Sequence, residues 1–282
     1  MKIPDHPELY PFTLNFDGVY AHIPFIFDKT PVTLIGKNTA PSGLISARAA
    51  GDMSFCLTSL NKKRDMFFRS MGIPPEKVYS LFQIHSRDVF TLGEPAAQTP
   101  AALPHPDVFA RQGDGMVSFS SAAVLAVTVA DCLPVFLLDT EKGYWSLLHS
   151  GWKGTGIVLK ALAIMQKAGT RPEAIAAVLG PCIQDCCYQV DEERSKMFEA
   201  EFGAASPYVQ SFDKYPLGKV IRHDAFGWYI SLQAANARLL AAAGVRHIAY
   251  CTDCTFTDER LGSFRREGSQ SYTHMIALAG YF

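Results

Sequence analysis

The chain contains no apolar run that approaches the roughly 20 residues a helix needs to cross a bilayer. Its first residues, MKIPDHPELYPF, also lack the hydrophobic segment of a secretory signal peptide. No long basic run is present and the formal net charge is −1, so the electrostatic footprint of most nucleic-acid binders is missing. We therefore expect a cytoplasmic protein that binds a small molecule, and neither a membrane nor a nucleic acid.

Several motifs are missing as well. There is no Walker loop and no GxGxxG fingerprint, and none of the eight histidines belongs to a His-x-His pair of the kind that a multicopper laccase needs. Cysteine is present seven times, an odd number. In a cytoplasmic chain this count favours free thiols or metal ligands over a disulfide framework.

The chain is rich in hydrophobic residues, which make up 48% of its 282 positions and can bury a substantial core. Predicted strands and helices are interspersed without a regular βα repeat. This order favours the α+β class, with mixed β-sheets flanked by helices in a single compact domain. Residues 1–43 are expected to add edge strands and loops to a domain formed by residues 44–282.

Hydrophobic periodicity predicts the following elements. Strands are expected at residues 78–85, 123–129, 135–139, 144–149, 175–180, 245–251 and 275–281, and helices at residues 55–71, 156–168, 191–202 and 226–244. We expect residues 123–129 and 135–139 to pair with each other around Ala130, Asp131 and Cys132.

Three candidate metal ligands, His85, Cys132 and His149, each come at the end of a predicted strand. One thiolate and two imidazoles are ligands that suit a late first-row metal such as zinc. Three protein ligands leave a fourth position open, which is typical of a catalytic rather than a structural zinc site. The same Cys132 and His149 also fit a thiol nucleophile with its base.

Other side chains near these positions suit substrate contacts. Lys153 lies in a glycine-rich turn before a predicted helix, and Arg48 lies beside Ala-Ala-Gly, so both are candidates for holding phosphate. Gln83 and Asp114 are candidates for substrate binding. Asp131, together with Asp114, is a candidate for orienting a metal ligand or transferring a proton.

The remaining cysteines are predicted to be structural. Cys251 and Cys254 form a CxxC motif, but no second CxxC or HxxxH lies nearby to complete a zinc site. Cys182, Cys186 and Cys187 can join them in three dimensions, although the surrounding Pro and Asp favour a rigid loop over the core.

Seven motifs occur in an order that resembles the laccase-domain family, whose members are also labelled multicopper polyphenol oxidases, peptidoglycan editing factors and purine nucleoside phosphorylases. They are QIHS at 83–86, GDGMVS at 113–118, ADCLPV at 130–135, HSGWKG at 149–154, GPCIQDCCYQV at 180–190, CTDC at 251–254 and SFRREG at 263–268. The resemblance covers roughly residues 44–282.

The resemblance implies an α+β fold of the laccase-domain, cytotoxic necrotizing factor-like type. It implies one Zn²⁺ on the family's His, Cys and His, which fall on His85, Cys132 and His149. It also implies phosphorolysis of adenosine, inosine and methylthioadenosine, and deamination of adenosine. The implied partners are a purine nucleoside and phosphate, and we expect a monomer or weak homodimer.

Several positions depart from the family's pattern. Ser86 replaces a glycine, Lys153 replaces an arginine, residues 47–51 replace a Thr-Arg-x-Gly-Gly turn, and the usual Thr-Gly-Arg is missing around residues 272–274. These departures fall on substrate and phosphate contacts, whereas all three metal ligands are kept.

Three alternatives stay open. Cys132 and His149 can serve a cysteine hydrolase that acts on amides or cell-wall precursors. A copper-dependent polyphenol oxidase is less favoured because His-x-His pairs are missing, although a His₂Cys site can bind copper. The altered substrate positions also fit a catalytically impaired homologue that binds a partner.

Overall fold

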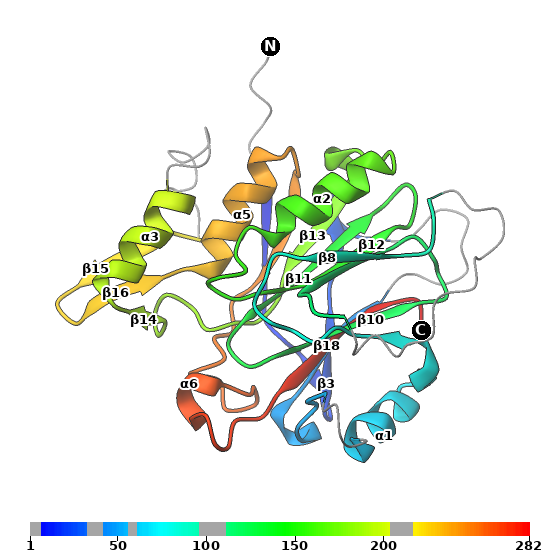
Figure 1. Cartoon of the computed structure of the whole chain (residues 1–282), viewed down its shortest axis with the longest axis horizontal. Coiled ribbons are helices and arrows are strands. Elements are labelled where there is room, and N and C mark those ends of the chain that lie inside the picture. The colour runs from blue at the N-terminus through cyan, green and yellow to red at the C-terminus, as the bar shows by residue number, and fades with distance from the viewer. Residues whose placement is uncertain (1–6, 33–41, 56–60, 96–110, 204–216) are drawn as a thin grey trace, which may run out of the picture.

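The computed structural model describes residues 7–32, 42–55, 61–95, 111–203 and 217–282. Two β-sheets form its centre, and helices lie on their outer sides (Figure 1). In spatial order, the seven-stranded sheet contains β1 (Glu8–Phe12), β17 (His247–Cys251), β13 (Ile175–Leu179), β11 (Leu133–Asp139), β12 (Trp145–Ser150), β9 (Gly115–Ser118) and β8 (Val89–Leu92). The six-stranded sheet contains β2 (Phe16–Asp17), β3 (Tyr20–Ile23), β6 (Ser42–Ser46), β18 (Met275–Gly280), β10 (Val124–Val129) and β7 (Val78–Tyr79).

Smaller elements complete the fold. A three-stranded sheet has the order β14 (Gln189–Val190), β16 (Gly227–Ile230) and β15 (Ile221–Asp224), and β4 (Ile26–Phe27) pairs with β5 (Thr30–Pro31). The α-helices are α1 (Lys62–Ser70), α2 (Ile157–Lys167), α3 (Glu192–Phe202), α5 (Leu232–Ala242) and α6 (Phe264–Glu267). Short 3₁₀ turns lie at η1 (Arg48–Ala50), η2 (Pro75–Lys77) and η4 (Pro172–Ala174).

Strand β11 is buried on both faces. Leu133, Val135 and Leu137 point into a core shared with α2 and α5, whereas Phe136 and Leu138 point into the core between the two sheets. The two-residue period of a strand sends alternate side chains to opposite faces. Because both faces are covered, β11 is a continuous apolar run.

The six-stranded sheet follows the same rule. From β10, Leu125 and Val127 enter the core between the sheets, and Val124 and Ala126 enter a third core with Phe68 of α1. The molecule therefore has four layers: α2 and α5, the seven-stranded sheet, the six-stranded sheet, and α1 (Figure 1).

Residues Ala130, Asp131 and Cys132 cross from one sheet to the other. Strand β10 pairs with β18 and β7, whereas β11 pairs with β12 and β13. The expected pairing of residues 123–129 with 135–139 is therefore wrong. The crossover requires a sharp bend, and Asp131 has a φ of +86°, a left-handed value that side chains rarely adopt.

Three further expectations differ from the structure. Within the described residues, the helix expected at 55–71 begins only at Lys62, where the Asn61 side chain accepts a hydrogen bond from the Arg64 amide at 3.1 Å. The strand expected at 78–85 ends at Tyr79. The helix expected at 226–244 is β16 followed by α5, because Gly227–Ile230 pairs with β15.

The predicted α+β class is confirmed, with sheets that mix parallel pairs such as β13 and β17 with antiparallel pairs such as β11 and β12. Of the strands from residues 1–43, β1 and β2 lie at sheet edges, whereas β3 lies between β2 and β6. Among the helices of the described residues, none has both the length and the apolar character needed to span a bilayer.

Candidate metal centre and its cavity

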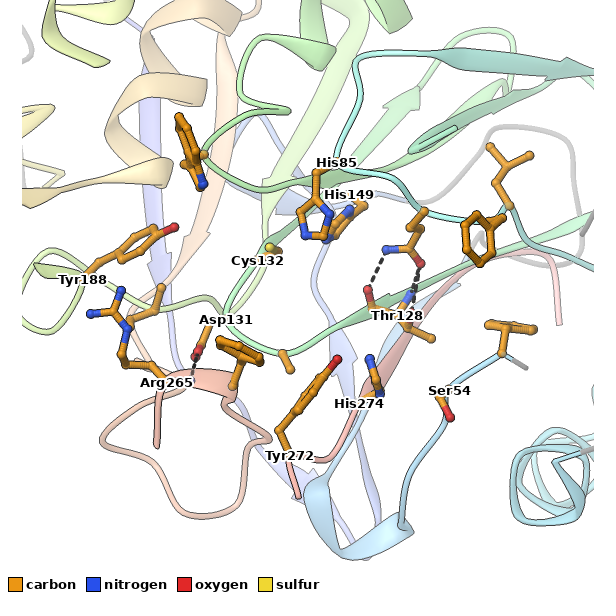
Figure 2. Close-up of a pocket in the computed structure, with 18 of the residues that line it drawn as sticks. Ser54, His85, Thr128, Asp131, Cys132, His149, Tyr188, Arg265, Tyr272 and His274 are labelled. Carbon is orange, nitrogen blue, oxygen red and sulfur yellow. Dashed lines mark hydrogen bonds between the residues drawn. The ribbon is translucent and has the colours of Figure 1, made fainter. Parts of the chain in front are cut away.

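The structure brings His85, Cys132 and His149 together. One ligand atom from each lies within 4.8 Å of the others, and the two imidazole rings meet edge to face at 4.9 Å between centroids. Figure 2 shows the three side chains converging on one point. His149 is 3% exposed, Cys132 is partly buried and His85 is exposed, so the group is open on one side only.

Each ligand comes from a different part of the fold. His149 lies on β12 and Cys132 lies at the end of the crossover just before β11. Antiparallel pairing of Leu133 with Ser150 and of Pro134 with His149 fixes the distance between these two ligands. His85 is six residues beyond the end of β7, so it does not terminate a strand as expected.

The fully buried carboxylate of Asp114 holds two of the ligands in place. Its oxygens accept hydrogen bonds from His149 Nδ1 at 2.8 Å and from the His85 amide at 3.0 Å. They also accept from the Ile84 amide at 3.2 Å and from the Ser86 amide and hydroxyl at 2.6 and 2.8 Å. Because Nδ1 faces Asp114, Nε2 of His149 is the nitrogen directed at the ligand group.

The backbone of His85 is strained, because its φ of +59° lies in the left-handed region that residues other than glycine rarely adopt. The hydrogen bonds that three consecutive backbone amides donate to the Asp114 carboxylate hold this conformation. Gln83 fixes the same segment to β10: its amide donates to the Thr128 carbonyl at 2.8 Å and accepts from the Thr128 amide at 2.8 Å. A segment without regular strand pairing is thereby held rigidly.

Charges within this group are coupled. Burial alone raises the pKa of Cys132, but His149 and His85 outweigh it and lower the pKa to about 6. Burial alone lowers the pKa of His149, but Cys132 and Asp114 raise it to about 9. Without a metal, the group is a thiolate beside an imidazolium, a pair that serves both metal binding and nucleophilic catalysis.

Gly151 is required by the close approach of the chain to the ligands. A Cβ atom at this position would lie 2.9 Å from Cys132 Sγ and 3.1 Å from a ring carbon of His85. Any larger residue therefore displaces one of the two.

A cavity of about 530 Å³ opens beside the ligand group. His85, Cys132 and His149 line one part of its wall, and Tyr272 and His274 lie across from them (Figure 2). The wall also includes five side chains that sequence reasoning did not single out as site residues: the aromatic Trp152, Tyr188 and Phe264, and the cationic Arg194 and Arg265. The size and the aromatic lining suit a small organic ligand.

Both residues predicted to contact phosphate lie outside this cavity wall. Arg48 forms an ion pair with Glu267 at 3.4 Å and lines a different cavity. Lys153 is exposed, with its ammonium 5.4 Å from the centroid of the Trp152 ring, and it is not part of the cavity wall. Among the described residues, the permanently cationic side chains that line the cavity are Arg194 and Arg265.

Asp131 and Gln83 line the cavity, but their polar atoms are engaged. Asp131 accepts hydrogen bonds from the Thr255 hydroxyl and from the Arg265 amide, both at 2.6 Å. It therefore ties the crossover to the start of α6. Asp114 is absent from the cavity wall and contacts the ligands instead of facing a substrate.

His274 was visible in the sequence only as part of the altered residues 272–274. Its Nδ1 and its amide both contact Asp52 at 2.9 Å, and the Tyr272 ring lies 4.5 Å away between centroids. Hydrogen bonds to His274 hold the pKa of Asp52 well below its usual range, although burial alone raises it. The arrangement is a carboxylate–imidazole pair on the wall opposite the metal ligands.

The ligand group fits a zinc ion. Zinc bonds of about 2.0–2.3 Å place tetrahedral ligands roughly 3.3–3.8 Å apart. The three donor atoms here all lie within 4.8 Å of one another, close enough for one ion to reach all of them after small side-chain movements. The donor set of two imidazoles and one thiolate is also one that zinc prefers. Asp114 supplies the carboxylate that orients metal-binding histidines in many such sites.

Replacing Asp114 tests how the ligands are held. We expect Asp114→Asn to weaken zinc binding by roughly 10- to 100-fold, because the amide keeps the shape but loses the charge that orients His149. The matched control is Asp139→Asn, which alters another buried carboxylate that accepts two backbone amides at 2.9 Å, at the far end of β11. Equal zinc affinity in Asp114→Asn and the native chain would contradict this role.

Alkylation tests the state of Cys132. In metal-free protein, iodoacetamide should modify this thiol at a rate that rises with pH through about 6 and is level near pH 7, because the pKa is lowered. Loading with zinc should abolish the reaction, whereas a free catalytic nucleophile would still react. Peptide mapping separates Cys132 from Cys182, whose pKa is raised by burial.

Comparison with known proteins places this geometry in a family. Residues 55–280 match the family described as multi-copper polyphenol oxidoreductase laccase. A purine nucleoside phosphorylase of Corynebacterium glutamicum is 32% identical over 201 residues, covering 71% of this chain and 73% of that protein. An adenosine deaminase from an unknown prokaryotic organism is 31% identical over 161 residues, covering 52% of this chain and 56% of the relative.

A solved structure agrees in fold. YlmD from Geobacillus stearothermophilus superposes with a TM-score of 0.74 at 22% identity, and 99% of each chain is covered. The match spans four-fifths of the sequence and the whole described fold, so the resemblance found in the motifs is confirmed. This chain belongs to the multi-copper polyphenol oxidoreductase laccase family.

Proposed function

We propose that the protein is a zinc-dependent purine nucleoside enzyme that carries out phosphorolysis of adenosine, inosine and methylthioadenosine, and deamination of adenosine. The observation that carries this proposal is the position of an open His₂Cys ligand group on the wall of an aromatic-lined cavity. The names of relatives about 31–32% identical support the substrate class.

His85, Cys132 and His149 would hold the zinc ion. Bound there, zinc supplies a Lewis acid that stabilises negative charge developing on an oxygen beside it. The His₂Cys group can also bind copper, but a multicopper oxidase would need paired histidines that the sequence lacks.

The cavity wall divides into parts with separate tasks. Trp152, Tyr188, Phe264 and Tyr272 offer flat surfaces against which a purine base can stack. Within the described residues, the guanidinium group of Arg265 donates to the Gln189 carbonyl at 3.0 Å through one Nη atom, which leaves most of its five N–H groups for an anion. Arg194 is partly neutralised by Asp191 at 3.7 Å and packs over Trp152.

In phosphorolysis, a phosphate oxygen forms a bond to C1′ of the sugar while the bond from C1′ to the base nitrogen breaks. The departing base gains electron density and needs a proton. His274 is placed to provide it, because Asp52 engages Nδ1 and thereby orients Nε2 toward the cavity that the ring lines. Arg265 orients the attacking phosphate.

A cysteine hydrolase is the second candidate, because the lowered pKa of Cys132 and the neighbouring His149 form an activated thiol pair. The two functions make opposite demands on the thiol, since zinc masks the sulfur that a nucleophile needs free. Protection of Cys132 by stoichiometric zinc therefore favours the nucleoside enzyme.

The direct test is incubation of zinc-loaded protein with adenosine, with and without phosphate. We expect adenine and ribose 1-phosphate only when phosphate is present, and inosine or hypoxanthine wherever deamination occurs. Stoichiometric zinc with none of these products would overturn the nucleoside assignment and leave the metal site standing.

Substitution of single arginines tests which of them binds phosphate. Arg265→Met should raise the KM for phosphate by roughly 10- to 100-fold, which corresponds to one charged hydrogen bond. Arg48→Met should have less effect, because Arg48 is paired with Glu267 outside the cavity. Arg171→Met, which alters an exposed ion pair with Glu141, serves as the unrelated control. A larger effect from Arg48 than from Arg265 would return phosphate binding to the position that the sequence suggested.

Removal of the imidazole on the opposite wall tests proton transfer. His274→Gln should lower kcat by about 10²- to 10⁴-fold and flatten one limb of the pH profile, while zinc content stays unchanged. His223→Gln is the matched control, because His223 is an exposed histidine that packs on Trp228. An unchanged pH profile in the His274 variant would exclude the proton-transfer role.

A further inference from the structure

A second group of cysteines lies outside the cavity wall. Cys186 and Cys187 are consecutive in the turn after β13, and Cys254 comes three residues after β17. Their three sulfur atoms lie within 4.8 Å of one another, and Sγ of Cys186 is 3.3 Å from Sγ of Cys187. Two segments separated by more than sixty residues thus present three thiols at one place.

Hydrogen bonds between the two segments hold this arrangement. Cys182 and Cys254 form an isolated parallel bridge, in which the Thr255 amide donates to the Cys182 carbonyl at 3.1 Å. The Gln184 amide donates to the sulfur of Cys254 at 3.4 Å. The thiol group is therefore ordered by the backbone before any ligand arrives.

Helix α5 braces the same two segments from behind. The Gln233 amide donates to the Gly180 carbonyl at 3.2 Å and to the Cys251 carbonyl at 2.8 Å. This side chain is 6% exposed, so the two bonds lie in the core. Gln233 therefore links Gly180, which precedes Cys186 and Cys187, to Cys251, which precedes Cys254.

The donor set is entirely sulfur. Within the described residues, no histidine or carboxylate joins the three cysteines to form a larger ligand group. Thiolates are soft ligands that select soft cations such as Cu(I), and three of them fall one short of the four ligands in a structural zinc site. Cys254 is buried, Cys187 is partly buried and Cys186 is exposed, which gives a cation an approach from the solvent.

Thiols must lose their protons to bind a metal, so filling of this site would release protons. Arg222 donates to the Asp185 carbonyl at 2.9 Å beside the cysteine group, which helps to order this turn, and its charge is paired with Asp224.

We propose that Cys186, Cys187 and Cys254 form a three-thiolate binding site for a soft, thiophilic cation, separate from the His85, Cys132 and His149 group. Binding forms three metal–sulfur bonds and releases three protons, with no change in oxidation state. Cu(I) is the cation whose preference for few sulfur ligands fits best, and Cd²⁺ provides a spectroscopic probe of the same chemistry.

The test uses the full chain in a reducing buffer with a phosphine, after removal of bound metals. A Cys132→Ser background removes the sulfur of the other ligand group. We expect Cd²⁺ to produce a sulfur-to-metal charge-transfer band in this background that saturates at one equivalent. Cys254→Ser in the same background should remove the band or weaken Cd²⁺ binding by about tenfold or more. Cu(I), added with a competing chelator of known affinity, should show the same dependence.

Two further variants keep the result interpretable. Cys182→Ala alters a buried thiol of the same segment outside the group and should leave the band unchanged. Cys186→Ser alters an exposed ligand, so it should weaken binding without unfolding the chain, as thermal denaturation of the metal-free proteins will check. A band that is absent in Cys132→Ser, or that survives replacement of both Cys186 and Cys254, would overturn the proposal. Neither result depends on nucleoside turnover.

Discussion

The candidate metal centre depends on the buried carboxylate of Asp114. A carboxylate without solvent contact is costly unless hydrogen bonds replace its water, and here three amides, one hydroxyl and one imidazole do so. The same bonds hold His85 in a left-handed conformation and set which nitrogen of His149 faces the ligand group. Burial raises the pKa of Asp114, but the bonds to His149 and Ser86 outweigh it and lower the pKa. The carboxylate therefore stays charged, which is what an orienting partner requires.

The crossover between the sheets supplies the rest of the geometry. Strands β10 and β11 belong to different layers, yet only Ala130, Asp131 and Cys132 separate them. The bend is tied down through Asp131, whose two oxygens bond to Thr255 and to the Arg265 amide. A thiol placed at this bend is positioned by two packed layers, and it cannot shift without disturbing both.

The sequence predicted the class of the fold better than its pairing. Strand periodicity located residues 124–129 and 133–139 well, because both form apolar runs bounded by turn residues. It misassigned their pairing because a link as short as residues 130–132 is compatible with both a hairpin and a crossover between layers. The apolar character of residues 227–230 suits a helix as well as a strand, and only pairing with β15 makes them a strand.

In the site too, the sequence predicted the residues that adjoin strands, but not those that only the tertiary fold brings together. Cys132 and His149 could be placed from the sequence because each adjoins a strand, and strand pairing then joins them. The cationic residues of the cavity wall could not be predicted from the sequence. Whether an arginine faces a cavity with its charge free depends on which carboxylates it pairs with in the folded structure. Glu267 engages Arg48 away from the cavity, and the turn after His149 carries Lys153 to the surface. Meanwhile α3 and α6, which are far apart in the sequence, bring Arg194 and Arg265 to the wall. No local pattern encodes that convergence, so the cationic residues of the cavity wall could be identified only from the folded structure.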